Sequence, residues 1–211
     1  MIQIVISIDP STHFLFEIIN KLKENKVEFE VTKIYPNDES YAESLQIITN
    51  FPKKSIVVFL GHGQSDQLYG GECLGSFPKK PIIKSNQMNI FENQFLFILA
   101  CDSSKLIQRS FQQSKTIKSI GFGGLPTSIE EIIKDKKLFS EGISEETIEE
   151  FKKEILLIIS SSLSLYHCDF NKLKDYMILY LDQRIYNAVL IKNNRSLSNL
   201  LFKMRSELVL Y

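Results

Sequence analysis

The chain has 211 residues, of which 44% are hydrophobic and 24% are charged. This length and balance are typical of one globular domain, or of one domain with a small appendage. The 25 basic residues are matched by 25 acidic ones and form no marked block, so the charge pattern indicates neither nucleic acid nor a membrane as the main partner.

The first part of the chain alternates predicted strands and helices. Residues 2–8 are expected to form a strand, and the turn at residues 9–12 offers helix-capping side chains before a helix at residues 14–22. A second strand at residues 27–35 and a second helix at residues 41–49 follow. The N-terminus lacks a basic segment and a cleavage site, so it does not read as a signal peptide. This order favours a mostly parallel sheet with helices on its faces.

Two short apolar runs come next, and each ends in a side chain that can react. Residues 55–63 end in His62 and residues 95–103 contain Cys101. Both runs are continuous enough to be strands buried on two faces. Because ligands bind outside the carboxyl ends of the strands in an open α/β sheet, we expect the imidazole and the thiol to meet there.

The segments around these runs supply the connections. A small hairpin about Gly70-Gly71, helical turns at residues 85–93, a helix opening at residues 102–104 and a strand at residues 118–122 are predicted in this order. The loop at residues 123–127 is expected to need unusual backbone angles and close chain approach. A short helix at residues 128–136 is expected to follow.

From Ser144 onward the pattern becomes helical. Helices are expected from Ser144, over residues 170–190 and over residues 196–208, although residues 185–191 could instead form a strand. We therefore expect an α/β core at residues 1–140 and a helical extension at residues 141–211 packed on it in one compact unit. No apolar run approaches the roughly 20 residues that cross a bilayer.

Cys73, Cys101 and Cys168 are odd in number and widely separated, which favours a reducing cytoplasm over a disulfide scaffold. Adjacent His167 and Cys168 lack the spacing of a zinc site. We therefore expect a cytoplasmic protein with no metal and no other cofactor. Except for Cys101, these residues are interpreted as structural, as is His13.

A cysteine nucleophile needs surroundings that favour the thiolate, because an ordinary thiol has a pKa of roughly 8.5. The helix opening after Cys101 and the His62 imidazole would both act in this direction. His62 could also protonate the leaving amine. The backbone N–H groups of Gly63 and Cys101 could converge on a developing oxyanion. The competing interpretation is that Cys101 is a packing residue, since free cysteine is often buried.

The order of motifs resembles the signature of the caspase-like (clan CD) cysteine peptidases. An apolar strand is followed by His62-Gly63, and a second apolar strand ends in Ala100-Cys101-Asp102-Ser103. The order of this segment and Ser119-Ile-Gly-Phe-Gly-Gly124 is most similar to the CHAT family, over about residues 1–130. The resemblance implies a three-layer sandwich with a mostly parallel central sheet. It also implies peptide-bond hydrolysis, with Cys101 as nucleophile, His62 as general acid/base and Gly63 N–H in the oxyanion hole.

Substrate recognition departs from this pattern. Metacaspase-like enzymes carry an aspartate two residues before the nucleophile, where this chain has Leu99, so a pocket for Arg or Lys is not implied. Asp66, Glu72 and Asp102 are the candidates for acidic substrate contacts, although exposed loop acids are usually only solvated. CHAT domains are often fused to repeat modules or encoded beside partners in bacterial defence and cell-death systems. Here, activation by a separate protein is the corresponding expectation.

Three functions follow from these patterns. The leading hypothesis is a cytoplasmic endopeptidase that acts on a specific protein and is held inactive until a partner or ligand orders its loops. The second is a catalytically inactive caspase-like module that binds a partner through its sheet edge or its C-terminal helices. The third is a small-molecule or nucleotide-binding domain that uses Gly121-Phe-Gly-Gly124, although this run lacks the usual phosphate-binding spacing.

Overall fold

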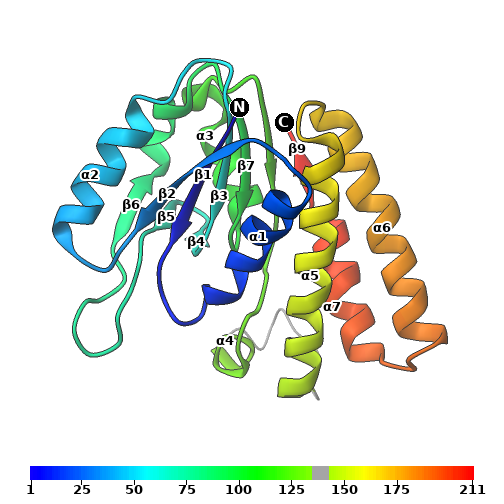
Figure 1. Ribbon diagram of the computed structural model, residues 1–211. Coiled ribbons are helices and arrows are strands. Elements are labelled where there is room, and N and C mark those ends of the chain that lie inside the picture. Colours follow the sequence, from blue (N-terminus) through cyan, green and yellow to red (C-terminus); the bar gives the residue numbers. More distant parts are fainter. Residues whose placement is uncertain (135–142) are drawn as a thin grey trace.

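A six-stranded sheet forms the centre of the molecule, which the computed structural model describes for residues 1–134 and 143–211 (Figure 1). The strand order is β2-β1-β3-β7-β8-β9, in which the first five strands are parallel and β9 is antiparallel to β8. The strands are β1 (Ile2–Ser7), β2 (Phe29–Ile34), β3 (Ile56–Leu60), β7 (Phe95–Leu99), β8 (Lys118–Gly121) and β9 (Val209–Leu210). The predicted α/β class with a mostly parallel sheet is confirmed.

Helices cover both faces of this sheet. They are η1 (His13–Leu15), α1 (Phe16–Glu24), α2 (Asp38–Thr49), η2 (Ser85–Phe91), α3 (Ser103–Ser114), α4 (Ile129–Lys134), α5 (Glu145–Tyr166), α6 (Phe170–Leu190) and α7 (Arg195–Ser206). Side chains alternate along β3, so Val58 and Leu60 pack with α1, α5, α6 and α7, while Val57 and Phe59 pack with α2, η2 and α3. Figure 1 shows the first group of helices on one side of the sheet and α2 on the other.

The central strands are buried on both faces, as their unbroken apolar runs predict. All six residues of β1 and all five of β3 are buried. The register pairs Leu60 of β3 with Ile6 of β1 and with Leu99 of β7. His62 lies two residues after Leu60, and Cys101 lies two residues after Leu99. Both residues are therefore at the same edge of the sheet.

A small antiparallel sheet crosses this edge. It consists of β4 (Gly63–Gln64), β5 (Gln67–Tyr69) and β6 (Pro81–Lys84), in the order β4-β5-β6. The predicted hairpin about Gly70-Gly71 is wrong, because the tight turn falls at Ser65-Asp66 instead. The two glycines leave β5 beside Tyr41, whose hydroxyl donates a hydrogen bond of 2.8 Å to the carbonyl oxygen of Gly71.

The C-terminal third contributes to the same core. Ser144 caps α5, as predicted, through a hydrogen bond from Thr147 N–H to its side chain. Helix α6 is continuous to Leu190, so the strand interpretation of residues 185–191 is wrong. Val209 and Leu210 form β9, a strand that is too short to be predicted from a sequence pattern. The predicted helix at residues 128–136 is α4 as far as residue 134, and its last two residues lie outside the described residues.

Across residues 1–134 and 143–211, none of the helices combines the length and the apolar character that crossing a bilayer demands.

Phe122 provides a test of the core beneath the site. It is fully buried and meets the Phe97 ring edge-to-face, with centroids 5.5 Å apart. We expect Phe122→Ala to lower the free energy of unfolding by about 3–5 kcal/mol in urea denaturation, because the cavity would not close. The same change at Phe202, which is 57% exposed, should cost no more than about 0.5 kcal/mol. Equal effects of the two substitutions would contradict this packing.

Candidate active site

His62 and Cys101 line one small cavity at the carboxyl edge of the sheet. The cavity has a volume of about 20 Å³, enough for one water molecule. Its lining comes from the β1–α1 connection, the ends of β3 and β7, the loop after β8, and α5. The residues are Thr12, Phe14, Leu15, Gly61, His62, Leu99, Ala100, Cys101, Leu125, Thr127 and Ile155. The structure thus brings together the two side chains that the sequence proposes as a dyad.

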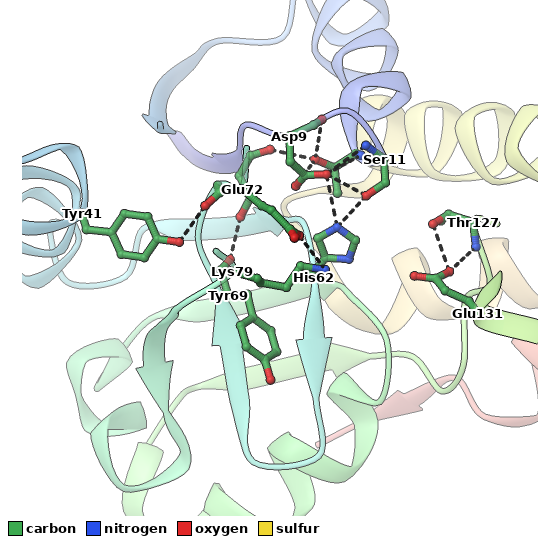
Figure 2. Close-up of polar contacts among 12 residues, drawn as sticks. Asp9, Ser11, Tyr41, His62, Tyr69, Glu72, Lys79, Thr127 and Glu131 are labelled. Atoms are coloured by element: carbon green, nitrogen blue, oxygen red, sulfur yellow. Dashed lines mark hydrogen bonds and ion pairs between the residues drawn. The ribbon is translucent and has the colours of Figure 1, made fainter. Parts of the chain in front are cut away.

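The His62 ring is held from one side by the turn after β1 (Figure 2). Its Nε2 lies 2.7 Å from Ser11 Oγ and 3.3 Å from Asp9 Oδ1. The Asp9 side chain is only 2% exposed and that of His62 10%. These contacts make a buried carboxylate the partner of the imidazole.

Hydrogen-bond counting assigns the ring tautomer. Ser11 has one hydroxyl hydrogen, and it is directed to Asp9 Oδ1 at 2.7 Å, because an ionised carboxylate can only accept. Nε2 must then carry the hydrogen that it shares with Ser11 and Asp9. We infer that His62 is protonated at Nε2, which leaves the lone pair of Nδ1 available as a base.

The same geometry excludes Ser11 as the nucleophile of a serine triad. In such a triad the serine and the carboxylate occupy opposite ring nitrogens of the histidine. Here Ser11 and Asp9 both lie at Nε2. Their contacts therefore orient the ring.

Asp9 is kept ionised by its own turn. Burial by itself would raise the pKa of Asp9, but hydrogen bonds from His62, Ser11 and Thr12 outweigh burial and hold the pKa well below its ordinary value. The backbone N–H groups of Ser11 and Thr12 also donate to Oδ1, at 2.9 and 3.1 Å. This turn is expected from the sequence to cap the following helix, but the N-cap residue of η1 makes no side-chain cap hydrogen bond. The Asp9 side chain instead accepts hydrogen bonds from within its own turn.

Cys101 is turned toward the loop after β8. Its Sγ lies 3.3 Å from the carbonyl oxygen of Leu125 and 3.4 Å from the Leu125 nitrogen. Burial raises the pKa of the Cys101 thiol to about 12, and the negative charges of Glu131 and Asp102 act in the same direction. The expectation of a pKa lowered by the helix and the imidazole is therefore wrong for this conformation.

The first turn of α3 explains why the helix does not activate the thiol. The N–H of Asp102 donates to Gly123 O at 2.9 Å, and that of Ser104 donates to Phe122 O at 2.8 Å. These carbonyls satisfy the groups that would otherwise attract a thiolate. Asp102 has a left-handed φ of 54° and does not cap the helix with its side chain, which bonds to Lys105 instead.

The dyad is open in this conformation. Both residues lie in the described part of the chain, and no hydrogen bond joins the His62 ring to the Cys101 sulfur. Catalytic hydrogen bonds are often long or absent before substrate binds. The arrangement is that of a protonated thiol and an oriented imidazole facing one cavity.

The backbone of Gly63 lies close to that of Cys101. Tyr69 N–H donates to His62 O at 3.0 Å, so the next pair, Gly63 and Leu68, is the non-hydrogen-bonded one and Gly63 N–H points away from β5. A Cβ at Gly63 would lie 2.8 Å from the Cys101 carbonyl oxygen, which explains the glycine. Gly63 and Cys101 are therefore neighbours across the site.

The loop after β8 is fixed by the C-terminal part of the chain. Gly124 N–H donates to Glu207 Oε2 at 3.0 Å, and a Cβ at Gly123 would overlap that carboxylate. The predicted close approach is confirmed here. The predicted unusual backbone angles are not, because neither glycine has a positive φ. Glu207 thus positions the loop whose Leu125 holds the thiol.

The three acids proposed for substrate contacts do not line the cavity. Asp66 is exposed in the β4–β5 turn. Glu72 pairs with Lys79 at 3.3 Å, and Asp102 pairs with Lys105 at 2.7 Å. The acids that contact lining residues are Asp9, which is bound to His62, and Glu131 of α4, which accepts hydrogen bonds from Thr127.

Sequence reasoning missed Asp9, Ser11, Leu125 and Glu207 as parts of this site. A signal for Asp9 existed, because it follows β1, a third strand that ends at the same edge. Glu207 gave no signal, since it lies more than eighty residues from Gly124 along the chain.

The chain has no match among the known proteins with which it was compared. No protein-family model matches the chain, and no curated protein sequence matches it.

Thiol reactivity tests the conformation of Cys101. Cys73 and Cys168 are exposed, so iodoacetamide at pH 8 should modify them at least about tenfold faster than Cys101, as followed by mass spectrometry of peptides. Glu207→Ala should speed alkylation of Cys101 alone, because Gly124 loses its acceptor. Glu207→Gln, which keeps an acceptor oxygen, should resemble the parent. Equal rates at the three thiols of the parent would contradict the structure.

The pKa of Asp9 predicts a pH-dependent stability. Because this pKa is lower in the folded than in the unfolded chain, the ionised carboxylate stabilises the fold above about pH 3.9, and the stabilisation is lost as the pH falls below that value. Asp9→Asn should therefore lower the free energy of unfolding at pH 7, and the deficit should shrink toward pH 3 in urea titrations. Asp175→Asn, at an exposed position, should show no such trend. A deficit that is constant with pH would argue against the ionised pair.

Proposed function

We propose that this chain is a caspase-like cysteine endopeptidase that cuts a specific protein through Cys101 and His62. The observation that carries the proposal is the shared cavity, which is lined both by the thiol and by an imidazole whose Nε2 is bound to buried Asp9. The strand order, with His62 after β3 and Cys101 after the adjacent β7, supports the resemblance drawn from the sequence.

The reaction would begin with attack of Cys101 Sγ on the carbonyl carbon of the scissile peptide. The thiol proton passes to His62 Nδ1, and the N–H groups of Gly63 and Cys101 stabilise the negative oxygen of the tetrahedral intermediate. His62 then gives this proton to the leaving amine, the C–N bond breaks and a thioester remains. Water, deprotonated by His62, attacks the thioester and releases the carboxylic acid, and the proton returns to the sulfur.

Asp9 and Ser11 act by positioning. They hold the Nε2 hydrogen, so Nδ1 faces the reaction with its lone pair. The Asp9 carboxylate also stabilises the imidazolium that forms when Nδ1 takes the thiol proton. Neither residue touches the substrate in this scheme.

The resting thiol implies an activation step. Sγ must leave Leu125 and approach Nδ1, and the segments that control this are the loop at residues 123–127 and the connection between Gln64 and Asn93. A separate protein partner or a ligand would move these segments. The protein would act in a bacterial defence or cell-death system, in the reducing cytoplasm. The free thiols of Cys73, Cys101 and Cys168 are in keeping with that compartment.

One alternative is a catalytically inactive binding module, which the high pKa of Cys101 favours. Such a module would have no use for a buried carboxylate that orients His62. The nucleotide-binding alternative is weakened by the Gly121–Gly124 run, whose Phe122 and Gly123 carbonyls cap the N-terminus of α3. The N–H groups of Asp102 and Ser104 are thereby withheld from a phosphate.

Cleavage of a proteome-derived peptide library tests the proposal, with new N-termini identified by mass spectrometry. Cys101→Ala should abolish cleavage and His62→Ala should reduce it by at least about 100-fold, because the nucleophile or its acid/base is lost. Asp9→Asn should give a smaller loss. The matched controls Cys168→Ala and His167→Ala should cut like the parent. A Cys101→Ala protein that cuts as well as the parent would refute the peptidase.

A further inference from the structure

The wall of the cavity beside the dyad is apolar. Six of its side chains are hydrocarbon: Phe14 and Leu15 before α1, Leu99 and Ala100 at the end of β7, Leu125 in the loop after β8, and Ile155 of α5. Among the lining residues, all of which the structure describes, His62 and Cys101 are the only titratable ones. A side chain that enters this cavity exchanges water for hydrocarbon.

The charged groups near the cavity already hold hydrogen-bond or ion-pair partners. Glu131 accepts from Thr127 N–H at 2.6 Å and from its hydroxyl at 3.1 Å, and Asp9 is bound to His62 (Figure 2). Lys79 pairs with Glu72 at 3.3 Å. An acidic group in the cavity would lose its hydration and meet the negative charge of Glu131, and a basic group would exchange its hydration for walls that are mostly hydrocarbon. Each loss costs several kcal/mol.

The size of the cavity sets a second limit. A volume of about 20 Å³ holds one water molecule or a group of similar size, such as a methyl group. Close-packed walls resist larger groups, because overpacking forces side chains out of their rotamers. In the resting conformation the cavity accommodates alanine or a similarly small residue, but not phenylalanine or arginine. Phe14, Leu15, Leu99 and Ile155 of its wall lie outside the loop at residues 123–127 that activation would move.

We propose that the cavity is the specificity pocket, and that the protein cleaves after a residue with a small, uncharged side chain. This inference rests on the proposed peptidase function. The cavity adjoins Cys101 and His62 together, so the side chain that enters it belongs to the residue whose carbonyl carbon faces the sulfur. Leu99 forms part of the wall and contributes no charge to it.

Peptidyl acyloxymethyl ketones that differ only in the residue before the ketone test this proposal on the full chain. Such a probe alkylates the sulfur, releases a carboxylate and leaves a thioether that peptide mass spectrometry places on a particular cysteine. We expect the alanine probe to label Cys101 at least about tenfold faster than the arginine, aspartate and phenylalanine probes. Exposed Cys73 and Cys168 report on non-specific alkylation in the same sample.

The outcomes separate the pocket from the peptidase. Faster labelling of Cys101 by the arginine, aspartate or phenylalanine probe, or equal labelling by all four, would overturn the small uncharged pocket and leave the peptidase standing. If no probe labels Cys101 beyond the rate at Cys73 and Cys168, the proposed function falls and the pocket assignment falls with it.

A substitution that enlarges the pocket tests the pocket assignment independently. Leu99→Ala removes part of the wall and should raise labelling by a leucine probe relative to the alanine probe, by about tenfold or more. Arginine should stay excluded, because no charge is added. Leu179→Ala changes the same residue type where it is 67% exposed and should leave the ratio unchanged. A ratio unaffected by Leu99→Ala would contradict the assignment.

Discussion

The parallel register of β1, β3 and β7 is the constraint on which the site depends. Ile6, Leu60 and Leu99 lie side by side across the sheet, so the residues that follow them leave at one edge. Asp9, His62 and Cys101 are widely separated along the chain, and each follows a different strand of this set. The strands are buried on both faces, and a shift of register would expose apolar side chains on either side. The hydrophobic core thereby fixes the relative position of the chemical groups.

At this edge the carboxylate and the thiol respond to burial in opposite ways. Asp9 is nearly inaccessible, yet hydrogen bonds from its own turn and from His62 keep it ionised. Among the described residues, Cys101 has only the carbonyl and the N–H of Leu125 as hydrogen-bond partners, so burial raises its pKa and keeps it protonated. The same edge of the sheet thus holds an ionised carboxylate beside His62 and a protonated thiol at Cys101. The loop that contacts the sulfur is in turn bound by Glu207, which links the end of α7 to the surroundings of the thiol.

Most of the fold could be predicted from local patterns. Continuous apolar runs indicated β1, β3 and β7, and periodic apolar residues with Ser144 as a cap indicated α5. Errors occurred where the pattern was short or where tertiary contacts decided. The hairpin was placed at Gly70-Gly71, but those glycines serve contacts with Tyr41. Strand β9 has two residues and exists only because β8 offers it an open edge.

The sequence by itself determined which side chains would end the central strands, since hydrophobic periodicity places His62 and Cys101 at strand ends without knowledge of the rest. Only the tertiary structure decided their surroundings. The pairing of His62 with Asp9, the protonated state of Cys101 and the apolar cavity all arise from segments that are far apart in the sequence. Burial and hydrogen bonding are properties of packed neighbours, and a pKa or a pocket cannot be read from residues whose neighbours are unknown.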